Sequence, residues 1–585
     1  MNNIGDITKA FKLPITYNSK ITRLDDNIKT DLELVESINN GNKSDDKSDN
    51  KQDNKPEKQT LYSKLFSPQS NLGKTLLNSW SEYFSYDKKF LGANQEVFKT
   101  AKVEPMNNID DVFNLWLSVK NDTGFLEKYQ YVDWQFFERL NTNSQFLQFM
   151  SVYSFASPII SLLMPVILCI VPFFMLKIKR INITLSKYFE ILKKVMTQLP
   201  LNNWANMTSL TMENKVYTVV STVFYIFQLY QNVLSCIRFY TNQYNIENTL
   251  SKWREFITHT IKQADNLLEV TGRHVPFYLF NNNLKTKIAS LKRLEGYLNK
   301  IKPFKLGYKE LSNVGYNMKH FYEFYKNDTI KDTINYAFGI NAYFEHICGI
   351  QNQLKYCRLN KCKFTKKRCS FKDAYYPMIE HDAAVKNSYS LKANSLITGP
   401  NAAGKTTLLK TTLFNILISQ QIGFGYYKSA KLAPYNYLHC YLNIPDTSGR
   451  DSLFQAEARR CKDILDKIKC STERHFCIFD EIYSGTNPYE ATASASSYIE
   501  LLSTFKNVGF MLTTHYIDIC KKNTKKNIKN YHMAINQVNN NLEYTYLLKD
   551  GISGIRGGIK VLRDLGYPDD MIKNTDSYLE NAPAQ

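Results

Sequence analysis

The chain of 585 residues is 43% hydrophobic and 14% aromatic, and its 74 Lys and Arg outnumber its 54 Asp and Glu to give a formal net charge of +20. This length predicts two or three domains, and the apolar content can fill a large core, which excludes a mainly disordered or fibrous protein. The positive charge favours an anionic partner, namely nucleic acid, nucleotide or an acidic membrane surface, without distinguishing among them.

Cysteine usage and the start of the chain bear on the compartment. The 11 cysteines are scattered and form no Cys-x-x-Cys pair, which is typical of reduced thiols rather than of a disulfide framework. Met1 is not followed by the basic cluster and apolar run of a secretory signal. We therefore expect an intracellular protein, cytosolic or nuclear. The abundance of Lys, Asn, Ile and Tyr is typical of an AT-rich genome.

Residues 1–60 are predicted to be a disordered, low-complexity tail. From about Asp25 to Gln59 the chain consists mainly of Asn, Asp, Lys, Ser and Glu, with few apolar residues. Such a composition buries too little apolar surface to offset the conformational entropy that is lost on folding.

Residues 61–245 are predicted to form a helical region that contains an unusual apolar segment. No residue between Arg139 and Lys177 is charged, and Ser157–Leu176 is long enough to cross a hydrocarbon layer. Prolines at positions 158, 165 and 172 recur every seven residues, so on a helix they share one face and interrupt its hydrogen bonds. This pattern predicts a kinked or re-entrant membrane-associated segment.

A second uncharged stretch, Val216–Ile237, is a weaker candidate for membrane contact because it carries Gln228, Gln231 and Asn232. The alternative interpretation of both stretches is that they are buried helices of a large α-helical core. The residues alone leave both interpretations open.

Residues 246–370 are predicted to be a helical, lever-like or clamp-like region. Apolar residues recur every three or four positions, as an amphipathic helix requires. The first series is Ile246, Leu250, Trp253, Ile257, Ile261, Ala264 and Leu268, and the second is Leu284, Ile288, Leu291, Leu294, Leu298 and Ile301.

A glycine-rich loop is the strongest signal in the chain. A short apolar strand, Ser395–Thr398, leads into the loop, and a helical run follows it, so the pattern G-x-x-x-x-G-K-[ST] has the strand, loop and helix that a P-loop requires. Backbone N–H groups would surround the phosphates, Lys405 would neutralise them, and Thr406 would bind Mg²⁺. The predicted nucleotide-binding residues are Gly399, Pro400, Asn401, Ala402, Ala403, Gly404, Lys405, Thr406 and Thr407.

Two further apolar strands end in polar residues. The first, 475–479, ends in Asp480 and Glu481, and the second, 508–512, ends in Thr513, Thr514 and His515. In a parallel nucleotide-binding sheet, one carboxylate would bind the metal and the next would act on the attacking water. We assign Asp480 to Mg²⁺, Glu481 to general base catalysis, and His515 to the γ-phosphate or the water.

These motifs resemble the ATPase domain of the MutS family of DNA mismatch repair and recombination proteins. The loop from Thr398 to Thr406 is similar to the family's TGPNxGGKS, the segment from Asp480 to Thr486 to its DEIxxGT, and Thr514-His515-Tyr516 to its THY. The resemblance implies an α/β P-loop ATPase domain of the ABC/MutS type over residues 371–585, preceded by the mainly α-helical lever region.

The same resemblance implies a dimer. Residues 451–457 are similar to the family's STFxxE segment, in which the serine reaches the γ-phosphate of the partner subunit, so Ser452 would act in trans. The segment 551–568 looks like the C-terminal segment that helps MutS ATPase domains to pair. By the same comparison, His532 corresponds to a residue near the adenine, and Asn387 to one that precedes the P-loop strand.

The front of the chain lacks this resemblance, and we expect the N-terminal mismatch-recognition domain to be absent. The sequence therefore predicts a dimeric, Mg²⁺-dependent ATPase that hydrolyses ATP to ADP and phosphate and switches a clamp on DNA, in mismatch repair or recombination. The alternative is a membrane-anchored, MutS-like ATPase that acts as a scaffold or partner switch without recognising mismatches.

Overall fold

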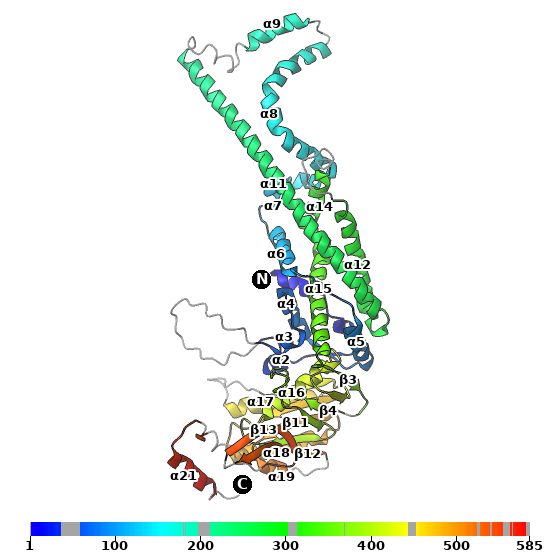
Figure 1. Ribbon diagram of the computed structural model, residues 1–585, viewed down its shortest axis with the longest axis vertical. Helices are drawn as coiled ribbons and strands as arrows, with labels where there is room; N and C mark the ends of the chain where they lie inside the picture. Colours follow the sequence, from blue (N-terminus) through cyan, green and yellow to red (C-terminus); the bar gives the residue numbers. More distant parts are fainter. Residues whose placement is uncertain are drawn as a thin grey trace. The chain divides into compact units, whose positions relative to one another are not determined.

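The computed structural model describes residues 2–36, 59–179, 181, 183–196, 211–301, 313–367, 369–442, 452–522, 527–538, 541–553, 562–563 and 565–580 (Figure 1). The chain forms two compact units, each built from segments that are far apart in the sequence. The first unit comprises Met1–Asp110, Thr260–Ala289 and Asn335–Gln585, and the second comprises Asp111–His259 and Ser290–Ile334. The units therefore differ from the consecutive blocks predicted above.

A six-stranded sheet in the first unit has the order β13-β12-β6-β11-β10-β9. The neighbours from β12 to β9 are parallel, and β13 pairs antiparallel with β12. In that order the strands are Asn541–Asp550, Ile528–Val538, Asn394–Thr398, Val508–Thr514, His475–Asp480 and Tyr437–Tyr441. Parallel neighbours need crossover connections, which α17 (Leu453–Lys469) provides from β9 to β10 and α18 (Pro488–Thr504) from β10 to β11.

A second sheet has the order β5-β4-β8-β3-β7 and is mostly antiparallel, with a single parallel pair between β3 and β8. Its strands, in that order, are Asn387–Ser390, Ser370–Ala374, Ser429–Leu432, Asn360–Phe364 and Phe424–Gly425. The predicted fold class, α/β in the C-terminal part and helical before it, is confirmed at this level.

Helices pack on the six-stranded sheet through an apolar core. The burial of the central strands follows from their sequence, because helices cover both faces of a parallel sheet and its strands become continuous apolar runs. The core contains Leu396, Tyr441, Cys461, Ile464, Leu465, Ile468, Cys477, Phe479, Ile482, Ala495, Tyr498, Ile499, Leu502, Phe510 and Leu512. The remaining C-terminal helices are α16 (Lys405–Ser419), α19 (Ile517–Lys522) and α21 (Asp569–Glu580).

Residues that precede position 110 belong to the same unit as the C-terminal sheets. The Tyr62 hydroxyl donates to Oε1 of Gln421 over 2.9 Å, and Nε2 of Gln95 donates to the carbonyl of Gly423 over 2.6 Å. The N-terminal elements are α1 (Asn2–Ala10), η1 (Pro14–Tyr17), β1 (Ile21–Arg23), α2 (Asp26–Asp31), α3 (Leu61–Phe66), α4 (Asn71–Trp80), β2 (Tyr83–Ser85) and α5 (Lys88–Thr100). Strands β1 and β2 pair antiparallel as a separate small sheet.

The prediction of a disordered tail over residues 1–60 is wrong for residues 2–36, whereas residues 37–58 lie outside the described part of the chain. The reason is that a few apolar residues among the charged ones are almost fully buried. They are Leu24, Ile28, Leu32 and Leu34, each at most 2% exposed. Composition averaged over a long window conceals this local pattern.

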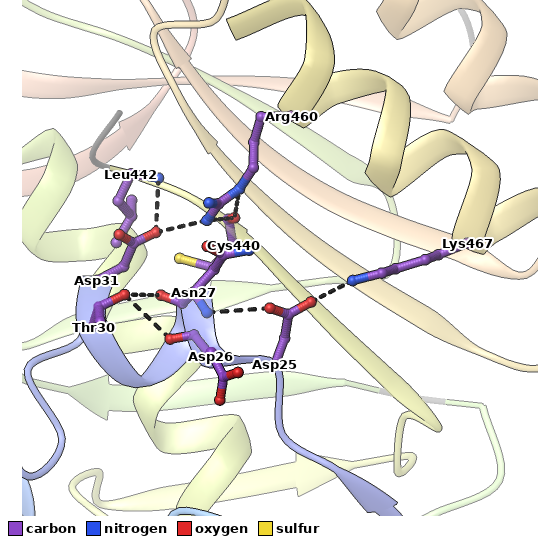
Figure 2. A network of polar contacts seen from close by, with 9 residues as sticks. All are labelled: Asp25, Asp26, Asn27, Thr30, Asp31, Cys440, Leu442, Arg460 and Lys467. Atoms are coloured by element: carbon purple, nitrogen blue, oxygen red, sulfur yellow. Dashed lines mark hydrogen bonds and ion pairs between the residues drawn. The ribbon is translucent and has the colours of Figure 1, made fainter. Parts of the chain in front are cut away.

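Helix α2 docks next to β9, the edge strand of the large sheet, through a network of ion pairs (Figure 2). Nη2 of Arg460, on α17, donates to Oδ2 of Asp31 over 3.2 Å and to the Cys440 carbonyl over 2.8 Å. Burial raises the pKa of the Asp31 carboxyl, and the charge of Arg460 opposes that rise. Lys467 pairs with Asp25 at the other end of the same surface. The N-terminal segment thus covers a sheet edge that would otherwise expose its backbone groups.

The second unit is helical. Its elements include α6 (Ile109–Lys120), α7 (Phe125–Lys128), η2 (Gln135–Thr142), α8 (Ser144–Ile178), α9 (Leu185–Met196) and α14 (Val314–Lys326). The helices α11 (Met212–Thr271), α12 (Tyr278–Leu298, after η3 at Val275–Phe277) and α15 (Asp328–Lys355) each contribute residues to both units. The two predicted amphipathic helices are confirmed as parts of α11 and α12, and Trp253 of α11 contacts Trp116 and Phe324 in an aromatic core.

Both uncharged stretches lie on long helices that are mostly exposed in the described part of the single chain, so the chain itself does not bury them in a core. The most apolar 18-residue window within Ser144–Met164 of α8 has a mean hydropathy of 1.5 and is 11% buried, and the corresponding window of α11 has a mean hydropathy of 1.2 and is 0% buried. By length and composition, both helices could cross a membrane.

The Asp31–Arg460 pair yields a stability prediction. Arg460→Met leaves the Asp31 carboxylate, only 5% exposed, without its cation, so the free energy of unfolding should fall by about 3–5 kcal/mol in chemical denaturation. Adding Asp31→Asn to that variant should recover part of the loss. On the same helix, Lys462→Met breaks the exposed pair with Asp466 and should cost about 1 kcal/mol or less. Equal losses of stability in the arginine and lysine variants would contradict a special role for the buried pair.

Candidate functional site

The polar residues predicted to act together meet at one edge of the six-stranded sheet. Strand β11 lies between β6 and β10, and all three run parallel. Their carboxyl ends therefore share one edge, where ligands bind in open α/β sheets. The glycine-rich loop follows β6, Asp480 ends β10, and Thr514 ends β11 just before His515.

The loop has the backbone conformation that its glycines allow. Gly404 adopts a φ of +93° as the residue that caps α16, and Gly399 has a φ of +151°. A Cβ on Gly404 would lie 3.1 Å from a ring carbon of Tyr546, and one on Gly399 would lie 3.3 Å from Cβ of Met533. The start of α16, with its unpaired N–H groups and partial positive charge, thus faces the loop, an arrangement that favours an anion.

Lys405 places a buried ammonium inside this loop. Its side chain is 4% exposed, and Nζ donates to the carbonyls of Gly399 over 2.9 Å and Pro400 over 3.1 Å. Nζ also lies 3.3 Å from Oε1 of Glu481. Burial lowers the pKa of Lys405, and the Glu481 carboxylate opposes that change. A buried cation of this kind gains most from a further anion beside it.

Asp480 and Thr406 form a pair of oxygen ligands next to Lys405. The Thr406 hydroxyl donates to Oδ2 of Asp480 over 2.6 Å, and the Thr513 hydroxyl donates to Oδ1. Burial raises the pKa of Asp480, so a cation at this position would stabilise the ionised carboxylate. A hydroxyl and a carboxylate are ligands that Mg²⁺ accepts, and the pair therefore fits the metal. Within the described ranges, no cluster of three or more His, Cys, Asp or Glu could hold a metal ion.

Glu481 is held between His515 and Lys405. Its Oε1 lies 2.7 Å from Nε2 of His515, and its backbone has a φ of +51°, which is uncommon for a residue with a side chain. Burial acts to raise the pKa of Glu481, but the hydrogen bond and charge from His515, together with Lys405, hold it below its usual value. The carboxylate is therefore ionised at neutral pH and can accept a proton.

A cavity of about 520 Å³ adjoins these groups. Of the predicted residues, Pro400, Asn401, Ala402, Gly404, Lys405, Thr406, Thr407, Asn387 and Glu481 line it. The rest of the wall is apolar and aromatic, and includes Tyr375, Tyr376, Ile379, Met533 and Tyr546, which the sequence did not single out. The cavity wall thus contains charged groups together with aromatic and apolar groups that could pack against a flat, apolar ring.

Asn387 precedes the P-loop strand β6, as the resemblance implied, and lines the cavity, whereas His532 does not line it. Asn387 has a positioning role as well as lining the cavity, because its amide donates to the Tyr546 carbonyl over 3.0 Å and accepts from the Leu548 N–H over 2.8 Å. His532 lies on β12 opposite Thr398 and is not among the residues that line the cavity, whereas its neighbour Met533 is. Successive residues of a strand point to opposite faces.

Ser452 is exposed at the start of α17. Its hydroxyl accepts a hydrogen bond from the Gln455 N–H over 3.3 Å, and the Gln455 side chain accepts from the Ser452 N–H, which makes a capping box. On the same helix the buried carboxylate of Glu457 accepts from the N–H and hydroxyl of Ser484 and from the N–H of Gly485. Glu457 thereby fixes the segment that follows Asp480 and Glu481.

The fold and site define an α/β domain with a mainly parallel sheet and a charged pocket at its carboxyl edge. Residues 395–582 match the family model of MutS domain V, the ATPase domain of that family. The C-terminal part of this chain is thus similar to the MutS family. Within the segment 551–568, residues 554–561 and 564 lie outside the described part of the chain, as does Asp451.

Three similar proteins illustrate the extent of the likeness. The DNA mismatch repair protein MutS of Persephonella marina is 28% identical over 209 residues, which are 34% of this chain and 24% of that protein. The endonuclease MutS2 of Finegoldia magna is 29% identical over 215 residues, 36% of this chain and 27% of that protein. The MutS of Bacteroides fragilis is 29% identical over 189 residues, 32% of this chain and 22% of that protein. The chain thus spans about a quarter of the length of these curated relatives.

Proposed function

We propose that this protein hydrolyses ATP to ADP and phosphate with Mg²⁺ and uses the cycle as a switch. The observation that carries the proposal is the group of four side chains at one sheet edge: buried Lys405 within 3.3 Å of Glu481, and Thr406 bonded to Asp480. The oxygens of a triphosphate would accept hydrogen bonds from the loop N–H groups and from the Lys405 ammonium. The aromatic and apolar residues of the cavity wall, such as Tyr375, Tyr376 and Met533, would pack against the base.

In this mechanism the chain supplies position and charge. Thr406 and Asp480 would hold Mg²⁺, which when bound supplies positive charge at the phosphate oxygens. Glu481, ionised at neutral pH, would orient the attacking water and accept its proton, while His515 holds the carboxylate through Nε2. Lys405 would neutralise charge that develops at the transferred phosphoryl group.

The active unit is proposed to be a homodimer with Ser452 acting in trans. In the single chain the Ser452 hydroxyl is exposed and makes a local capping contact with Gln455, so it is available to a second subunit at its surface. The start of α17 also presents N–H groups suited to a phosphate. A site completed by a neighbour would make hydrolysis depend on pairing.

DNA is the proposed partner of the switch, whether mismatched or branched. Several relatives are named DNA mismatch repair proteins, and the net charge of +20 favours a polyanion. Within α12, the exposed residues Lys285, Lys292 and Arg293 occur before the first acidic residue of the helix, Glu295. This positive segment is a candidate for contact with DNA phosphates.

A second candidate function, a membrane-anchored ATPase that switches a scaffold or partner without recognising mismatches, is favoured by the exposed apolar surface of α8 and α11. The two candidates make different demands on the same chain. The first requires DNA to change the ATPase rate, and the second requires the chain to reside in a membrane.

The assignment of the base predicts a separation of binding from hydrolysis. Glu481→Gln should lower the hydrolysis rate roughly 10²- to 10⁴-fold and leave ATP affinity nearly unchanged, because the base acts in the transition state. Lys405→Ala should instead weaken ATP binding, as measured by titration. Glu490→Gln, which changes an exposed carboxylate near the site, is the matched control and should hydrolyse normally. Hydrolysis by Glu481→Gln at the parent rate would refute the assignment.

The role of Ser452 predicts complementation between subunits. Ser452→Asn keeps a capping oxygen for α17 but removes the hydroxyl, and it should lose activity, as should Lys405→Ala. A mixture of the two variants contains dimers in which one composite site has both groups, so part of the activity should return in a steady-state ATPase assay. If mixed dimers form and no activity returns, Ser452 does not act in trans.

DNA binding predicts a steep dependence on salt. Affinity for duplex DNA, compared with mismatched and branched duplexes, should fall sharply between about 50 and 200 mM salt, with a log–log slope of about −0.9 for each phosphate that the protein neutralises. Changing Lys285 and Lys292 together to Gln should make that slope shallower by about 1 for each phosphate that the variant no longer binds. Changing Lys88 and Lys89, exposed residues of α5, is the matched control. Affinity that does not respond to salt would exclude a DNA clamp.

A further inference from the structure

Helix α8 and the first half of α11 carry the largest exposed apolar surface in the described part of the chain. On α11, the exposed apolar residues form a broad face that covers about half of the helix circumference, whereas Thr218, Tyr225, Asn232, Cys236 and Phe239 form a less exposed stripe on the other side. The exposed residues are Val216, Tyr217, Val219, Val220, Val223, Phe224, Ile226, Phe227, Tyr230, Val233 and Ile237, and on α8 they include Ile159, Leu162, Leu163, Met164, Ile170, Val171, Phe174 and Met175. An apolar face of this extent requires a cover of protein or of lipid.

The two helices contact each other in an antiparallel arrangement. The rings of Phe155 and Phe239 lie 5.0 Å apart, the Tyr225 hydroxyl donates to the Ser161 carbonyl over 3.1 Å, and the Asn232 amide donates to the Ser161 hydroxyl over 2.5 Å. Two polar side chains of this stretch, Tyr225 and Asn232, thus find a partner on the neighbouring helix, whereas Gln228 and Gln231 are exposed. Such a bond is the arrangement that polar side chains require in hydrocarbon.

The uncharged stretches of the two helices have similar lengths. Phe155 lies beside Phe239, next to Arg238, where the uncharged stretch of α11 ends. The other ends of the two uncharged stretches are at Lys177 on α8 and at Lys215 on α11. At 1.5 Å per residue, Ser157–Leu176 spans about 30 Å, the thickness of a hydrocarbon layer. Each stretch is therefore long enough to cross such a layer.

We propose that α8 and the first half of α11 form a helical hairpin inserted in a lipid bilayer. One stripe of α11 contacts α8 through Tyr225, Asn232 and Phe239, and lipid around the pair of helices would cover the broad apolar face that remains exposed.

The fold of the first unit fixes the number of crossings. Residues before 110 and after 335 fold together in that unit, as the bonds of Tyr62 and Gln95 to Gln421 and Gly423 show. Both ends of the segment between them must therefore lie on the same side of the membrane, so the chain crosses an even number of times. A single span by Ser157–Leu176 is excluded, and the hairpin with Val216–Ile237 satisfies the constraint.

The segment between the two uncharged stretches would then lie on the side of the membrane opposite to the first unit. It is basic, with Lys177, Lys179, Arg180, Lys187, Lys193, Lys194 and Lys215 against Glu190 and Glu213. Positive charge disfavours translocation of a short loop but is attracted to anionic headgroups once it is there. The location of this segment is accordingly the most demanding test of the hairpin.

The first experiment tests insertion with the full chain. The protein should float with neutral phosphatidylcholine vesicles and resist extraction by high salt and by alkaline carbonate, and detergent should release it. Ile226→Arg places a charge in the middle of the uncharged stretch of α11 and should reduce the inserted fraction by on the order of 10²-fold. Val275→Arg changes another exposed apolar residue, 87% exposed but outside the hairpin, and should have no effect.

Each alternative has a distinct outcome in that experiment. Release by carbonate, or failure to float, would overturn the proposal. A water-soluble oligomer that Ile226→Arg converts to smaller species would show that a second copy covers the helices, which also overturns it. ATP hydrolysis in detergent serves as a check of folding, and loss of hydrolysis in every form would count against the proposed enzyme without affecting the flotation result.

The second experiment tests the crossing. A membrane-impermeant maleimide is applied to sealed phosphatidylcholine vesicles that carry Ser186→Cys, a change at an exposed position of α9. The natural exposed cysteines Cys357 and Cys470 mark the ATPase side, and mass spectrometry of the peptides distinguishes the sites. The residue at 186 should be protected in the vesicles in which Cys357 is labelled, and detergent should abolish the difference. Labelling of both from the same side would overturn the hairpin.

Discussion

The buried ammonium of Lys405 is the charge on which the arrangement of the site depends. With 4% of its side chain exposed, it is stabilised by two loop carbonyls and by Glu481, and Glu481 is in turn held by His515. The loop can present those carbonyls because Gly399 and Gly404 adopt positive φ angles. A change in any of these residues therefore alters the environment of the others, and a phosphate is the ligand that would complete the set of charges.

Strand order explains how much of the site could be predicted from the sequence. The loop, Asp480 and His515 each follow an apolar strand, so their roles could be proposed from local patterns, and the parallel order β6-β11-β10 then brings them together. The aromatic wall could not be predicted in the same way. Met533 and Tyr546 come from β12 and β13, more than a hundred positions beyond the loop, and nothing distinguishes Tyr546 from the other 38 of the chain's 39 tyrosines.

The fold shows the same division between local and long-range information. The periodic helices near Trp253 and Leu291 could be predicted because their apolar spacing is local. The N-terminal segment could not, because the position of Asp31 is decided by Arg460, more than four hundred residues away, and the composition around it is that of a solvated chain. Likewise, the residues before 110 fold together with the C-terminal sheets through contacts between distant parts of the chain, such as the hydrogen bond of Tyr62 to Gln421.

In the sequence, the second uncharged stretch is the weaker candidate for membrane contact because its amides are polar in isolation. In the structure Asn232 donates to Ser161 of the neighbouring helix, so this amide does not count against a hydrocarbon environment. Each large apolar side chain moved from water is worth about 1.5–3 kcal/mol, and the two helices expose more than a dozen of them. That sum exceeds the usual net stability of a domain, about 5–15 kcal/mol. Left in water, this surface would drive association. The transfer free energy that would favour insertion of the two helices in a membrane therefore also requires that lipid or protein cover an apolar area of this size.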